Sequence, residues 1–137
     1  MPSRRAQISI LIIGDVITLA LVTGIGFATH GTLGTAGSRM LTTFVPLLVA
    51  WAAVAPFLGV YDPGRAMEPR QLWRPFWAMV LAAPLASWLR AVWLNAPILW
   101  IFVLVLGGFS ALGILAWRAL YVLAFARRLG APKVTHG

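Results

Sequence analysis

The sequence predicts an all-α integral membrane protein, folded as a four-helix transmembrane bundle. Hydrophobic residues make up 61% of the 137-residue chain and charged residues only 10%, whereas a soluble domain carries about 25% charged residues. The apolar residues fall into four runs of roughly 20 residues, the length that an α-helix needs to cross a bilayer. The 11 Lys and Arg outnumber the 3 acidic residues and cluster between these runs, as in the loops of multi-pass proteins.

The first predicted span covers about residues 8–29, behind a basic start that contains Arg4 and Arg5. A secretory signal peptide begins in the same way, but its apolar region is uncharged and about 7–15 residues long. This run is longer, contains Asp15 and is followed by further runs of similar length. We therefore expect a retained span rather than a cleaved leader.

The second predicted span covers about residues 40–61 and follows a loop rich in Gly and Thr. It contains Pro46 and Pro56, which membrane helices tolerate because neighbouring groups satisfy the freed carbonyls. We expect kinks at both prolines. Residues 62–71 hold two acids, two bases, two prolines and a glycine, and so form an aqueous loop.

The third predicted span covers about residues 72–94, and the fourth covers about 97–117, starting near Pro97 because proline suits a first helical turn. The short break between them predicts antiparallel neighbours. A basic cytoplasmic tail follows over residues 118–137, and its apolar side favours a helix that continues along the interface and ends at Gly130. The whole chain, 1–137, is thus expected to be a single transmembrane domain.

The basic residues predict the orientation of the four spans. Outside the apolar runs, one side collects eight basic residues and the other has only Arg39, so both termini should be cytoplasmic. The eight are Arg4, Arg5, Arg65, Arg70, Arg74, Arg127, Arg128 and Lys133. Six of the seven Trp also fall at the two predicted interfaces, and only Trp51 is placed in the middle of a span. The expected partners are the lipid bilayer and anionic lipid head groups at the cytoplasmic face.

Three ionisable residues lie within the spans, namely Asp15, Arg90 and Arg118. Such residues are functional candidates because each costs about 2.5–3.5 kcal/mol at the centre of a span. Helical phase places Asp15 and Arg118 on inward faces near the cytoplasmic boundary, which predicts an intramembrane ion pair. Two alternatives stay open: Asp15 handles a proton or ion, or it is an unpaired, protonated carboxyl.

His30 and Arg90 lie at a similar depth near the outer surface and are a candidate outer-face polar site. A single His with no second His, no Cys and no outer acid lacks a metal-ligand set, so we expect neither a metal nor a cofactor. The absence of Cys also excludes disulfides and thiol nucleophiles. Nucleic acid is not an expected partner, because the basic residues sit at span ends rather than on one soluble face.

Two short motifs look like enzyme signatures but do not predict an enzyme. Residues 24–29 partly match a dinucleotide fingerprint, yet they lie in an apolar span that no strand precedes. Residues 108–111 resemble the serine motif of rhomboid-like proteases, but Ser110 falls near mid-membrane and His30 at the outer surface.

An ordered series of short motifs resembles one known family. The series is Gly14-Asp15, Thr29-His30-Gly31, Pro46 followed by Trp51, Trp88-Leu89-Arg90 and Ala116-Trp117-Arg118. It resembles domain-of-unknown-function family 3054, small prokaryotic membrane proteins with four spans, over about residues 8–121. The resemblance implies four helices in a bacterial or archaeal plasma (inner) membrane, and it implies no activity.

The sequence favours a non-enzymatic accessory or scaffold subunit that packs into a homo-oligomer or a larger membrane complex. Helix faces of small residues and the lack of an assembled site support this hypothesis. The alternative is a small oligomeric transporter or channel that uses Asp15 as its ion- or proton-coupling residue, and it would need a dimer because four helices line a path thinly. A third hypothesis is that Trp51, His30 and nearby aromatics bind a pigment, quinone or lipid.

Overall fold

The computed structural model describes residues 3–29 and 37–130, and this part of the chain is helical with no strand. Four helices are long and apolar enough to span a membrane, which confirms the predicted helix class and number. The long helices are α1 (Arg4–Thr29), α2 (Gly37–Val54), α4 (Trp73–Leu94) and α5 (Trp100–Gly130). Three short segments join α2 to α4: η2 (Ala55–Leu58), α3 (Pro63–Ala66) and η3 (Pro69–Gln71).

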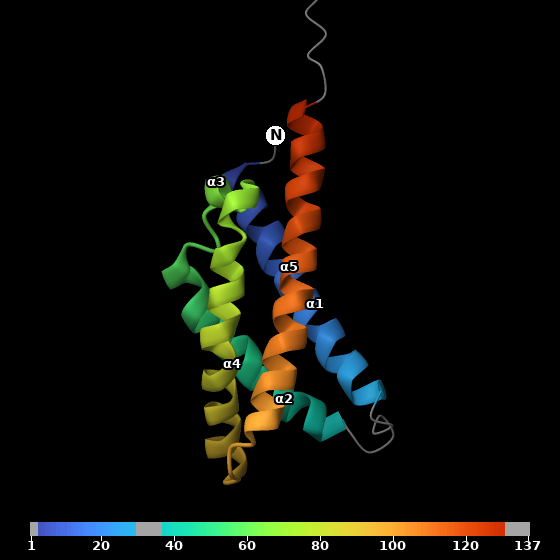
Figure 1. The fold of residues 1–137 in the computed structure, drawn as a ribbon, viewed down its shortest axis with the longest axis vertical. Coiled ribbons are helices and arrows are strands. Elements are labelled where there is room, and N and C mark those ends of the chain that lie inside the picture. The colour runs from blue at the N-terminus through green and yellow to red at the C-terminus, as the bar shows by residue number, and fades with distance from the viewer. Residues whose placement is uncertain (1–2, 30–36, 131–137) are drawn as a thin grey trace, which may run out of the picture.

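The start of α1 and the end of α5 lie at the same end of the bundle, together with α3 (Figure 1). We call this the basic end, because it collects Arg4 and Arg5 of α1, Arg65 of α3, Arg70 of η3 and Arg74 in the first turn of α4. The turn between α4 and α5 lies at the opposite end, and α1 crosses α5 obliquely. This up-and-down arrangement follows from short connections between consecutive helices.

The second apolar run does not form one helix to residue 61. Pro46 stays within α2, but Pro56 lies in the first turn of the 3-10 helix η2, and Gly59 ends that turn with φ +69°. Proline lacks the N–H that an α-helix needs, and glycine adopts left-handed backbone without a Cβ clash. The chain therefore turns at residues 55–61, where the sequence predicted a continuous span.

The fourth long helix begins three residues later than Pro97 and continues beyond 117 to Gly130, where the sequence predicts the helix to end. Asn95, with φ +49°, ends α4 in the left-handed conformation, which is a common helix C-terminus for Asn. Helix α5 then runs unbroken from Trp100 to Gly130. The first part of the predicted tail is therefore a continuation of the same helix, and Arg118 lies within it.

Small residues let the helices approach closely inside the bundle. Ala78, Ala82 and Ala86, spaced four apart on α4, are all buried. A Cβ added to Gly107 on α5 would lie 2.8 Å from the Cβ of Ala83. The small-residue faces that the sequence predicted are thus used for packing within this chain.

The outer surface of the bundle is apolar and includes most of the tryptophans. Trp51 differs from these because it is buried. Trp73, Trp77, Trp88, Trp93 and Trp100 all expose about half or more of their surface, whereas Trp51 is only 2% exposed. A groove of about 590 Å³ runs between α1 and α5, lined mainly by branched apolar side chains. An apolar exterior of this kind is expected of helices surrounded by lipid.

Candidate functional site

A buried carboxylate lies at the centre of the candidate site. Asp15 on α1 is fully buried, and Arg118 on α5 is 2% exposed. Arg118 donates from Nη2 to Oδ2 of Asp15 at 2.8 Å and from Nε to Oδ1 at 3.0 Å. The structure thus brings the two residues together in a bidentate ion pair, the arrangement in which a guanidinium matches a carboxylate best.

Arg118 also holds the turn that follows η2. Its Nη1 donates to the backbone carbonyl of Val60 at 2.9 Å. That carbonyl is available because Val60 lies after the left-handed Gly59, outside any helical ladder. One guanidinium therefore links α1, α5 and the 59–62 turn.

Tyr61 and Trp51 complete the set of donors around Asp15. The Tyr61 hydroxyl donates to Oδ2 of Asp15 at 2.7 Å, and Trp51 Nε1 lies 2.7 Å from the Tyr61 oxygen and 3.3 Å from Asp15 Oδ2. Burial first, and then the negative charge of Asp15, raises the pKa of Tyr61. The hydroxyl therefore keeps its proton and acts as a donor to the carboxylate.

We call Asp15, Trp51, Tyr61 and Arg118 the Asp15 cluster. Sequence reasoning singled out the acid and the arginine but missed the other two members. The sequence places Trp51 alone in mid-span, where it is a candidate for binding a pigment, quinone or lipid, and it gives no reason to connect Trp51 or Tyr61 with Asp15. The signal that could have found Trp51 was that it alone failed to fit an aromatic belt.

Two glycines let α1 and α5 pack closely beside the Asp15 cluster. A Cβ on Gly14 would overlap the indole ring of Trp117, and a Cβ on Gly113 would lie 2.8 Å from Cγ2 of Val22. Helix α5 can therefore lie against α1 at the level of Asp15, which brings Arg118 within bonding distance of the acid.

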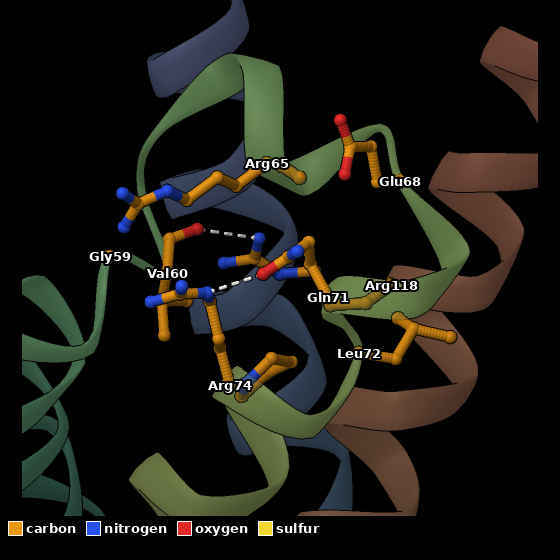
Figure 2. A pocket seen from close by; sticks show the side chains of 10 residues that line it. Gly59, Val60, Arg65, Glu68, Gln71, Leu72, Arg74 and Arg118 are labelled. Carbon is orange, nitrogen blue, oxygen red and sulfur yellow. Dashed lines mark hydrogen bonds between the residues drawn. The ribbon is translucent and has the colours of Figure 1, made fainter.

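A small pocket lies next to the cluster toward the basic end (Figure 2). Its volume is about 10 Å³, enough for one water molecule. Arg118 lines it together with Gly59, Val60, Arg65 and Arg74. Arg74 is anchored there by two hydrogen bonds, from Nη1 to the Leu58 carbonyl at 2.8 Å and from Nε to Gln71 Oε1 at 2.6 Å.

The predicted outer-face polar site lies partly outside the described residues, because His30 is not among them. Arg90 is described, and its guanidinium stacks on the Phe102 ring at 4.9 Å, a cation–π contact. Within residues 3–29 and 37–130, no group of three or more His, Cys, Asp or Glu is placed to hold a metal ion.

Chemically, the Asp15 cluster is a saturated ion pair. Asp15 accepts four hydrogen bonds, two from Arg118 and one each from Tyr61 and Trp51. A buried charge is stable only when it is paired and hydrogen-bonded, and both conditions hold here, with three bonds to Oδ2 and one to Oδ1. Such an arrangement joins separate elements of the fold and leaves Asp15 no exposed surface for a ligand.

A family model described as "Protein of unknown function (DUF3054)" matches residues 12–121, about four-fifths of the chain. The chain belongs to the DUF3054 family. All four members of the Asp15 cluster lie within the matched DUF3054 region, and the match confirms the resemblance seen in the sequence. Searches of curated proteins and of solved structures found no match, and the DUF3054 description assigns no activity.

Proposed function

We propose that this DUF3054 protein is a non-enzymatic accessory or scaffold subunit of a bacterial or archaeal plasma membrane. The observation that carries the proposal is the saturation of Asp15 by Arg118, Tyr61 and Trp51. A coupling carboxylate must release its partners in order to take up an ion or proton, whereas this one is held by donors from three parts of the chain. A carboxylate held in this way favours a structural role.

The proposed orientation has both termini in the cytoplasm. Four helices of spanning length support membrane insertion, and both ends of the described chain lie at the basic end of the bundle. Arginines collect at the cytoplasmic side of multi-pass proteins. In this orientation the basic end faces the cytoplasm, where anionic lipid head groups are its proposed partners.

Native purification tests the scaffold role. A tagged full-length chain is extracted from its own membranes in mild detergent, and the proteins that come with it are identified and quantified. The proposal expects a second protein that co-purifies in constant ratio to the tagged chain. It also expects Asp15→Asn to reduce the amount of this complex only in proportion to the fraction of the chain that the substitution unfolds. A bare homo-oligomer with no second protein would favour the transporter alternative over a subunit of a larger complex.

The alternative function is a small oligomeric transporter or channel that uses Asp15 for ion or proton coupling. The observation that favours it is the pocket beside Arg118, since one water molecule there would touch the guanidinium that binds the acid. Proteoliposomes test it by proton and cation flux. Flux that Asp15→Asn abolishes, in a variant that remains folded, would support the transporter and overturn the scaffold.

A further inference from the structure

Two arginines from different elements converge on Gly59. Arg65 comes from α3 and Arg74 from the first turn of α4. The Nη1 atoms of Arg65 and Arg74 lie 2.6 and 3.3 Å, respectively, from the position that a Cβ on Gly59 would take. The two guanidinium groups are therefore close neighbours, and like charges so close together favour a bound anion.

Gly59 makes this convergence possible. Its φ of +69° ends η2, and its N–H donates to the Pro56 carbonyl at 3.1 Å. A side chain at this position would strain the backbone and also collide with Arg65. The same glycine thus turns the chain and leaves room for both guanidinium groups.

The nearby carboxylates leave the pair of charges largely uncompensated. Among the residues that the structure describes, no carboxylate lies within ion-pair distance of Arg74. Arg65 lies 3.7 Å from Asp62 through Nε, and both side chains are about half exposed. Glu68 also lines the pocket and is exposed, but among the described residues its carboxylate forms no ion pair with either arginine.

Arg118 lines the same pocket, but its charge is already matched by Asp15. The positive charge of Arg74 in the pocket is therefore unmatched, and that of Arg65 is matched only by the half-exposed Asp62 at 3.7 Å.

We propose that Arg65 and Arg74 bind the phosphate group of an anionic phospholipid, with the Gly59 turn as the floor of the site. Guanidinium groups match phosphate oxygens in geometry and charge, and the pocket between them has room for one such oxygen. Arg74 also stacks on the exposed Trp73 at 4.5 Å, and exposed Trp marks the depth of lipid head groups. The inference rests on the proposed membrane location, and it does not depend on the scaffold role.

Phosphatidylglycerol binding to the purified full-length protein tests the site, with phosphatidylcholine as the reference lipid. Arg65→Gln should lower the affinity for phosphatidylglycerol at least about tenfold more than Arg70→Gln does. Arg70→Gln is the matched control, because it removes the same charge from an exposed neighbour that does not line the pocket. Arg65→Lys should restore part of the affinity, since it restores the charge without the planar fork.

Equal losses for Arg65→Gln and Arg70→Gln would show a diffuse charge effect and overturn the site. Arg74→Gln should lower the affinity for phosphatidylglycerol as much as Arg65→Gln does. Because Arg74→Gln also removes the hydrogen bond to the Leu58 carbonyl, the comparison of Arg65→Gln with Arg70→Gln decides the test.

Inorganic phosphate distinguishes the two sources of the phosphate group. Competition between it and phosphatidylglycerol supports one shared phosphate site, whereas binding of inorganic phosphate alone would make the lipid assignment wrong. Loss of the co-purifying protein with lipid binding intact would count against the scaffold role alone.

Discussion

Asp15 illustrates at the residue scale how a carboxylate is kept inside an apolar bundle. Taking a charge out of water costs several kcal/mol, and the loss is recovered only with good geometry and further hydrogen bonds. Arg118 supplies the opposite charge in bidentate form, and Tyr61 and Trp51 supply neutral donors. Losing either partner should therefore be costly, because the guanidinium of Arg118 stays buried and charged when Asp15 is gone, and the carboxyl group of Asp15 stays buried without a cation when Arg118 is gone.

A double-mutant cycle tests this mutual dependence. Asp15→Asn leaves a buried guanidinium without its counter-charge, and Arg118→Leu leaves a buried carboxyl group without its cation, so each substitution should lower the free energy of unfolding. The double variant should recover part of that loss, with a coupling of about 0.6–2 kcal/mol. Reversible unfolding in mixed micelles provides the measurement. Strictly additive costs would mean that the two residues do not stabilise each other.

The Tyr61 hydroxyl predicts a dependence of stability on alkaline pH. The pKa of Tyr61 is raised above the ordinary 10.0. The stabilisation that the protonated hydroxyl gives the folded state is therefore complete below pH 10.0 and is lost as the pH rises through the pKa of the folded state. The free energy of unfolding should therefore fall more steeply above about pH 10 in the wild type than in Tyr61→Phe. Trp51→Phe, which retains the tyrosine, should keep the steep fall. Parallel curves for wild type and Tyr61→Phe would contradict the prediction.

At the scale of the helices, the contact of α1 with α5 depends on Gly14. Gly14→Ala should lower the free energy of unfolding by about 1–3 kcal/mol, because the new methyl group overlaps the Trp117 ring. Gly108→Ala on α5 is the matched control, since nothing lies within 4 Å of its added Cβ. That substitution should be neutral or stabilising by about 0.5–1 kcal/mol. Similar effects of the two substitutions on the free energy of unfolding would show that the packing of α5 against α1 does not depend on Gly14.

The positions of the helices could be predicted from the sequence, but the turn at residues 55–61 could not. Run length and helical phase are local properties, so they located four helices and placed Asp15 and Arg118 on inward faces. They could not tell that Pro46 stays in a helix while Pro56 opens a 3-10 turn, since both lie in one apolar run. Tyr61 reaches an acid 46 positions away only because of that turn, and tertiary contacts of this kind leave no periodic signal.

For the whole molecule, the side of the membrane on which each segment lies is testable. The chain has no native Cys, so single cysteines at Ser3, Thr35, Ala66 and Thr135 can be labelled on intact cells with an impermeant thiol reagent. Only Thr35→Cys should react, because the positive-inside rule keeps the other three in the cytoplasm. Permeabilised cells are the control and should label all four. Labelling of Ala66→Cys on intact cells would overturn the proposed orientation.

The ion pair between α1 and α5 also sets a condition on the order of synthesis. Asp15 is made early and Arg118 late, with 103 positions between them. At about 5–20 residues per second, the carboxylate waits on the order of 5–20 s for its cation. During that interval α1 carries an acid whose partner does not yet exist. A chain that stops before residue 118 never obtains this partner. Its Asp15 carboxyl group stays unpaired, and this distinguishes an incomplete chain from a complete one.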